Sequence, residues 1–187
     1  QATVVHYCLW EKVKVWAEGS RGLFLERTKR RHLGERARPS FIAWSDAKDD
    51  PALADRIKWG KLKSESRAVE KQLRTYKGDT SRLVDVARQS VAFRSVADLT
   101  QCLTLIDADT ETCILRAKNR LDPDFDSALS VGYRDVALNL ALVDEQTTRL
   151  GAQWHVCEVQ LILVDFAMLK SDDGHKRYVQ FRNARAE

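Results

Sequence analysis

Two acidic residues have neighbours and spacing that suit metal-dependent phosphate chemistry. Glu158 lies in the middle of an apolar, strand-like run, and Asp85 lies within the apolar segment 83–87. A carboxylate with apolar neighbours is costly unless it has a partner. Carboxylates that converge on one face of a sheet are ligands that Mg²⁺ uses, with waters and substrate phosphates completing its shell. For the late strands alone, a ligand site and a carboxylate that faces solvent from a one-sided sheet are equally good interpretations.

The basic residues that phosphates would need lie just before Asp85. Lys63, Arg67 and Lys71 repeat every four residues, so a helix would place them on one face, and Arg74 extends this stripe. Lys61 begins the same basic stretch. Like charges on one stripe repel each other, which favours an anionic ligand over a solvated surface. Residues 1–80 carry 18 basic and 11 acidic side chains, whereas residues 81–187 carry 13 and 16. An anionic partner would therefore contact mainly the first half, although a solvated surface accounts for the rest of its charge.

Hydrophobic periodicity predicts the elements that position these residues. We expect a broken helix or two helices over 3–37, a helix capped by Asp50-Pro51, and a helix over 61–76 that Gly78 ends. Short strands then alternate with helices: strands near 91–93, 112–117, 133–143 and 154–164, and helices over 95–106, from 165 and past 174. This order predicts the α+β (α/β) class, with a mixed β-sheet flanked by helices. We assign residues 1–55 to an N-terminal helical extension and residues 56–187 to the domain.

Alternation along the two late strands predicts which side chains share a face. The core face should hold Val136, Leu138, Leu140, Cys157, Val159 and Leu161. The opposite face should hold Tyr133, Asp135, Asn139, Glu158 and Gln160, with Ala137 and Ala141 between them. Small residues beside polar ones would form a floor on which a flat ligand fits.

Composition excludes several classes of protein. With 44% apolar residues, 8 Gly and 3 Pro, the chain is neither disordered nor collagen-like. It lacks a membrane-length apolar run. Four widely spaced cysteines without metal-site spacing indicate a reducing, cytoplasmic setting, and we expect Cys113 and Cys157 to be core residues. Because the chain begins at Gln1, we expect it to be part of a longer protein. We expect the early tryptophans to be core residues or anchors for a protein partner or neighbouring domain.

The order of the motifs resembles the synthetase domain of the RelA/SpoT family, the alarmone synthetases, over roughly residues 55–187. The matching segments are Lys61-x-Lys63-x-x-x-Arg67-x-x-x-Lys71, Leu83-Val84-Asp85-Val86, Val131-Gly132-Tyr133-Arg134-Asp135 and Glu158-Val159-Gln160. The resemblance implies a nucleotidyltransferase-like sheet. It also implies an Mg²⁺-dependent enzyme that moves pyrophosphate from ATP to the ribose 3′-hydroxyl of a guanine nucleotide.

The resemblance also assigns roles by position. Asp85 and Glu158 would hold Mg²⁺, or Glu158 would act as the base on the attacking hydroxyl. Tyr133 would stack on guanine, and Gln160 would belong to the same nucleotide site. The ATP phosphates would contact the basic residues Lys61, Lys63, Arg67, Lys71 and Arg88.

Three departures from the family pattern keep other functions open. Ser90, Ala137 and Ile162 stand where the family has Arg, His and Arg. The second hypothesis is therefore a catalytically degenerate domain that binds nucleotide or RNA, or regulates a larger protein. A third hypothesis is an interaction domain whose Trp-rich front docks a protein partner.

Overall fold

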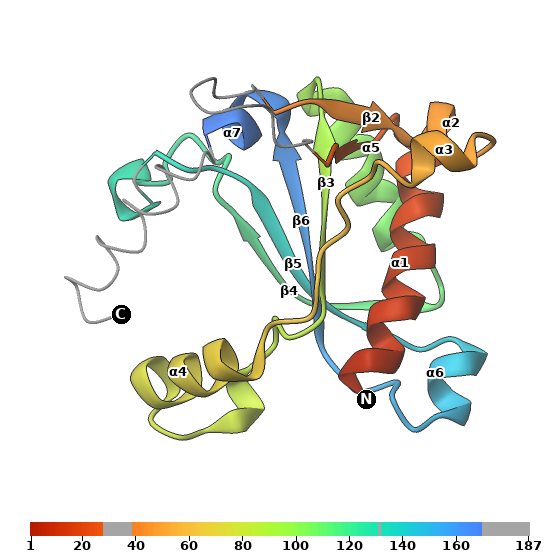
Figure 1. The fold of residues 1–187 in the computed structure, drawn as a ribbon. Helices are drawn as coiled ribbons and strands as arrows, with labels where there is room; N and C mark the ends of the chain where they lie inside the picture. Colours follow the sequence, from red (N-terminus) through yellow and green to blue (C-terminus); the bar gives the residue numbers. More distant parts are fainter. Residues whose placement is uncertain (28–38, 131, 170–187) are drawn as a thin grey trace, which may run out of the picture.

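A six-stranded mixed β-sheet organises the chain (Figure 1). Its strand order is β2-β1-β3-β6-β5-β4. The strands are β1 (Leu23–Leu25), β2 (Phe41–Ala43), β3 (Arg88–Phe93), β4 (Thr112–Asn119), β5 (Val136–Leu142) and β6 (Cys157–Leu163). Strands β3 and β6 pair in parallel, and the other neighbours are antiparallel. The structure is a computed structural model that describes residues 1–27, 39–130 and 132–169.

Helices α1 (Ala2–Gly19) and α5 (Val96–Asp107) pack on one face of the sheet. Apolar residues of α1 recur every three or four positions, and Val5, Leu9 and Val13 are fully buried. They join the strands in the main hydrophobic core, which also contains Leu138 and Leu161. The remaining helices are short, apart from α4 (Glu65–Tyr76): α2 (Trp44–Ala47), α3 (Pro51–Ala54), η1 (Thr80–Arg82), η2 (Ser127–Ser130), α6 (Glu145–Arg149) and α7 (Val164–Leu169).

The predicted alternation along β5 and β6 is confirmed. Val136, Leu138, Leu140, Cys157, Val159 and Leu161 are buried in the main core. Ala137, Asn139, Glu158 and Gln160 are half-buried between them. The mixed sheet flanked by helices is likewise the predicted fold class.

The helix predicted over Leu23 and Phe24 is wrong, because these residues form the edge-proximal strand β1. Gly22 makes the turn between α1 and β1 possible: a Cβ there would lie 2.7 Å from both the Ala17 Cβ and Val91 Cγ1. A three-residue strand is too short to show a period, and its partner β2 is distant in sequence. Residues 28–38 lie outside the described part of the chain. The division at residue 55 stays a prediction, but the sheet takes strands from both sides of it.

The predicted Asp50 cap is confirmed, and α4 begins later than expected. The Asp50 carboxylate accepts hydrogen bonds from the backbone N–H groups of Ala52 and Leu53, and Ser95 caps α5. Helix α4 begins at Glu65 rather than residue 61, so Lys61 and Lys63 precede it. It ends where Lys77 and Gly78 have φ values of 51° and 92°. The helix predicted past Gly174 lies outside the described residues.

The four cysteines are free thiols. Cys157 is fully buried as expected, but Cys113 is exposed on the edge strand β4, so its prediction as a core residue is wrong. Among the described residues, no helix is both long and apolar enough to cross a lipid bilayer. The cytoplasmic setting stays a prediction.

Candidate functional site

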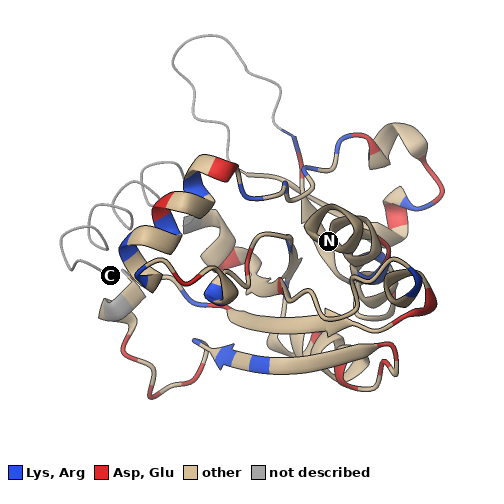
Figure 2. Cartoon of the chain, turned by 90° about the horizontal axis from the view of Figure 1, so that it is seen from below, with Lys and Arg blue, Asp and Glu red and all other residues tan. Residues whose placement is uncertain are grey.

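A cleft of about 510 Å³ lies between α4, the segment before it and the start of β3. Its walls contain Leu62, Ser64, six basic residues and two acidic residues: Lys61, Lys63, Arg67, Lys71, Arg74, Arg88, Glu70 and Asp85. We call it the basic cleft. Figure 2 shows basic and acidic residues along α4, which stands apart from the sheet in Figure 1. The predicted basic stripe and Asp85 are therefore brought together in one cavity.

An extended segment, residues 57–63, delivers two of these cations, and we call it the strap. Its first residue, Ile57, forms a β-bridge with Glu26. The Lys58 N–H donates to the Leu25 carbonyl at 2.7 Å, and the Lys63 N–H donates to the Val86 carbonyl at 2.9 Å. These backbone bonds fasten the strap to β1 and to the segment before β3.

Asp85 is a buried carboxylate with one satisfied and one unsatisfied oxygen. Both Lys63 Nζ and Lys71 Nζ donate to Oδ2, the latter at 3.0 Å. Oδ1 is buried without a hydrogen-bond partner. Burial would raise the pKa of Asp85, but the two lysines outweigh it and hold this pKa below its usual range. The carboxylate is thus charged and has an oxygen available for a cation.

The two lysines respond differently to the same carboxylate. Burial lowers the pKa of Lys63, and the attraction of Asp85 does not restore it. Burial also opposes the charge of Lys71, but Asp85 and Tyr76 together outweigh it and the pKa of Lys71 rises. The charges of Lys71 and Arg88 further depress the pKa of Lys63. The cleft is therefore crowded with positive charge, which an anion would relieve.

Glu158 lies on the sheet face beside the basic cleft rather than in its wall. It is the register partner of Arg88 across β3 and β6. Gln160 Nε2 donates to Glu158 Oε1 at 2.8 Å, and Ser90 Oγ donates to Gln160 Oε1 at 3.2 Å. Burial, and then the negative charge of Asp85, raise the pKa of Glu158 despite the opposing effect of Arg88. Glu158 is thus a carboxylate that either a proton or a metal cation would stabilise.

Strand register extends this polar face to the far edge of the sheet. Arg88, Glu158, Asn139 and Arg116 are successive partners across β3, β6, β5 and β4, and Ser90, Gln160, Ala137 and Lys118 form the next row. We call them the polar rows. The sequence did not predict Arg116 and Lys118, because a β-bulge between Ile114 and Arg116 interrupts the alternation of β4. Unbroken alternation would place both residues on the face of Ile114, which packs against the main core. Strands lie about 4.8 Å apart, so three steps separate Arg88 from Arg116 by roughly 14 Å.

Tyr133 lies away from the basic cleft. Its ring packs against a small apolar cluster that contains Ala92 and Ile162. Its hydroxyl donates to Asp135 Oδ2 at 2.8 Å, and Arg120 forms an ion pair with the other oxygen of this fully buried carboxylate. Burial, and then the negative charge of Asp135, raise the pKa of Tyr133. The expected stacking of Tyr133 on guanine stays a prediction.

The residues that would hold Mg²⁺ fit this ion. Within the described residues, no group of three or more His, Cys, Asp and Glu side chains converges as a metal site. Magnesium needs only one or two protein carboxylates when phosphates and waters supply the other ligands. The unpartnered Oδ1 of Asp85 and the raised pKa of Glu158 are both features that a cation would relieve.

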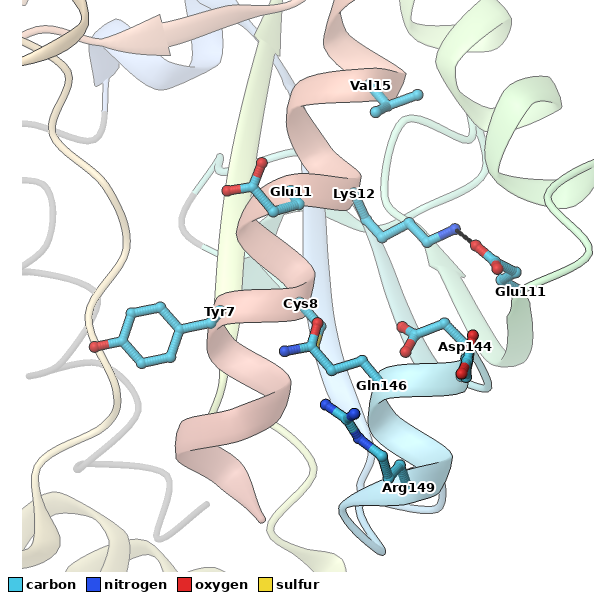
Figure 3. Close-up of a pocket in the computed structure, with 10 residues that line it drawn as sticks. Tyr7, Cys8, Glu11, Lys12, Val15, Glu111, Asp144, Gln146 and Arg149 are labelled. Carbon is cyan, nitrogen blue, oxygen red and sulfur yellow. Dashed lines mark hydrogen bonds and ion pairs between the residues drawn. The ribbon is translucent and has the colours of Figure 1, made fainter.

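A second cleft, of about 730 Å³, lies between α1 and α6 (Figure 3). Lys12 crosses its wall and bonds to Asp109 and Glu111 at 2.8–3.0 Å. Asp144 caps α6 by accepting from the Thr147 N–H. Among the described residues that line this cleft, none has a buried side-chain polar atom without a partner. We call it the α1–α6 cleft.

Solved structures with the same fold support the motif-based prediction. A GTP pyrophosphokinase family protein from Streptococcus pneumoniae matches with a TM-score of 0.53 at 16% identity, over 66% of this chain and 59% of that protein. Small alarmone synthetase 1 from Bacillus subtilis, bound to its product pppGpp, matches with a TM-score of 0.52 at 18% identity, over 68% and 67% of the two chains. No protein-family model and no curated protein sequence matches the chain. The chain has a RelA/SpoT-like nucleotidyltransferase fold. More particularly, it has the fold of the alarmone synthetases.

Proposed function

We propose that this domain transfers pyrophosphate from ATP to a guanine nucleotide or a related acceptor, with Mg²⁺. The observation that carries the proposal is the basic cleft, whose lining contains six basic residues and a buried carboxylate with an unpartnered oxygen. The fold and the order of the four motifs support the same reaction class. In such transfers, positioning and charge neutralisation provide most of the catalysis.

The basic cleft is the donor site in this proposal. Lys61 and Arg67 are exposed, so they are accessible to the phosphates of ATP. Lys63 and Lys71 lie deeper, on Asp85. Asp85 would hold Mg²⁺, which neutralises charge on the donor phosphates when it is bound.

The polar rows are the acceptor side. Glu158 would accept the proton of the attacking hydroxyl, and its raised pKa makes it a stronger base than an ordinary carboxylate. Gln160 fixes the orientation of Glu158 through the bond to Oε1. Arg116 and Lys118 would meet anionic groups of the acceptor at the far edge of the sheet. Tyr133 is the candidate for base stacking by resemblance alone.

The test is AMP release from ATP and Mg²⁺ in separate reactions with GDP, GTP and RNA. We expect AMP and a pyrophosphorylated product with a guanine nucleotide. Glu158→Gln should lower the rate by about 10²- to 10⁴-fold, because it removes the base. Glu145→Gln, which removes a carboxylate of the α1–α6 cleft, is the matched control and should keep the rate. Unchanged activity in Glu158→Gln would reject the assignment.

A degenerate, nucleotide-binding domain is the second candidate. Its supporting observation is Ile162, which stands where the family has Arg and is only 4% exposed within the small apolar cluster. Ala137 and Ser90 likewise replace His and Arg. ATP binding without AMP release for any acceptor would favour this candidate. Binding of RNA and docking of a protein partner stay predictions.

A further inference from the structure

One buried side chain holds the strap where it enters the basic cleft. Gln89 of β3 is 2% exposed, and its amide bonds to both backbone groups of one strap residue. Its Oε1 accepts from the Gly60 N–H at 2.9 Å, and its Nε2 donates to the Gly60 carbonyl at 3.3 Å. A buried polar side chain is retained at little cost when both its donor and its acceptor are satisfied.

The contact requires glycine on the strap. A Cβ at Gly60 would lie 2.4 Å from the Arg88 carbonyl oxygen and 3.0 Å from Gln89 Oε1. The first of these neighbours is backbone, which cannot move aside easily. The strap backbone therefore lies against β3 at a distance that no side chain allows.

The position of this contact links it to the donor site. Lys61 follows Gly60 directly, and Lys63 is fixed three residues later by its N–H bond to Val86. Figure 1 shows the chain descending beside β3 from α3 to α4. Strand β1 meets β3 only near its far end, where Leu23 is the partner of Ala92. The strap thus lies beside the first residues of β3, which are not paired with β1. The Gln89 amide joins the strap to β3 there.

We propose that Gln89 is a positioning residue that holds Lys61 and Lys63 in the basic cleft for the phosphates of a nucleoside triphosphate. The inference rests on the proposed function, since it assigns the basic cleft to those phosphates. Without the amide, the backbone groups of Gly60 lose their partners and the strap moves away from β3. Phosphate contacts made by the strap then weaken, while those made by Arg88, which lies on β3 itself, remain.

Calorimetric titration with inorganic tripolyphosphate tests the inference. Gln89→Leu should bind about tenfold more weakly, which is the effect of losing one charge-assisted contact. Val91→Ala is the matched control: Val91 lies on the same face of β3 and is fully buried. This control should lower the melting temperature and leave the affinity unchanged. Equal affinities for Gln89→Leu and the wild type would overturn the inference.

Two further comparisons separate positioning from general damage. Gln89→Leu should reduce the affinity less in a Lys61→Met background than in an Arg88→Met background, because Lys61 lies on the strap whereas Arg88 lies on β3. Equal costs in the two backgrounds would contradict the proposal. Gly60→Ala should reproduce the loss with Gln89 intact, which covers the case in which Gln89→Leu does not fold.

Hydrogen exchange distinguishes failure of this inference from failure of the proposed function. If the wild type binds no tripolyphosphate, the donor-site assignment is wrong. Faster amide exchange over residues 58–64 in Gln89→Leu than in Val91→Ala would then still show that the amide holds the strap. Equal exchange rates would reject the holding role itself.

Discussion

The basic cleft and the α1–α6 cleft are both lined largely by charged side chains, but their charges are arranged differently. In the α1–α6 cleft, Lys12 is shared by Asp109 and Glu111, and Trp16 Nε1 also donates to Asp109 at 3.0 Å. These interactions join α1 to the loop between α5 and β4. Charge in this cleft therefore holds elements of the fold together.

The basic cleft has an excess of cations. Lys61 and Arg67 are exposed, and Asp85 has an oxygen without a partner. Like charges in one cavity destabilise a protein unless a ligand compensates them. The volume of a cleft therefore says little about its function. Whether its charged groups already have partners is the more informative property.

The largest expected difference between the clefts is in anion affinity. The double variant Lys61→Met/Arg67→Met should bind tripolyphosphate about 100-fold more weakly, which corresponds to about tenfold for each lost charge-assisted contact. Its melting temperature should change little, because both side chains are exposed. Titration calorimetry and thermal unfolding measure the two effects.

Lys12→Met in the α1–α6 cleft should give the opposite pattern. Lys12 and Asp109 have side chains only 16% and 15% exposed. Loss of the ammonium leaves the acids of its network less satisfied and should cost about 1–3 kcal/mol of stability. Tripolyphosphate affinity should remain that of the wild type. A loss of affinity in Lys12→Met equal to that of the double variant would abolish the distinction between the clefts.

The sequence predicted those parts of the site that depend on local periodicity. Spacing placed Arg67 and Lys71 on one helix, and alternation placed Glu158 on the polar face. Lys63 precedes α4 and meets Lys71 through Asp85. Strand β1 and the Gln89–Gly60 contact could not be predicted, because each depends on a pairing between distant segments. Alternation could not have placed Arg116 either, because the β-bulge between Ile114 and Arg116 moves it to the face opposite that of Ile114.

A smaller effect is expected from Asp85→Asn. Asp85 holds two ammonium groups that phosphates need, so its neutralisation should release them and strengthen metal-free tripolyphosphate binding by about three- to tenfold. Added Mg²⁺ should improve binding by the wild type but not by the variant, because Asp85 is the proposed metal ligand. Calorimetry with and without EDTA measures both.

Glu70→Gln is the matched control for Asp85→Asn. It also removes one negative charge from the wall of the basic cleft, but Glu70 pairs only at 3.3 Å with Arg74 and its side chain is 59% exposed. Its affinity should change less than about twofold. If both variants gained the same affinity for tripolyphosphate, the loss of one negative charge would explain the gain. The ion pairs of Asp85 with Lys63 and Lys71 would then have no specific effect on anion binding.

The smallest expected effect is on the pH dependence of stability. It tests whether the pKa values of Asp85 and Glu158 are shifted in opposite directions. The folded-state pKa of Glu158 is raised, so its ionised form costs stability as pH rises above the ordinary glutamate value. Glu158→Gln should therefore raise the melting temperature at neutral pH by about 2 °C, with no gain below about pH 4. The folded-state pKa of Asp85 is lowered, so Asp85→Asn should lose stability at neutral pH and match the wild type in strong acid. Melting curves from pH 3 to pH 8 measure both; shifts of the same sign would mean that the lysines on Asp85 do not distinguish the two carboxylates.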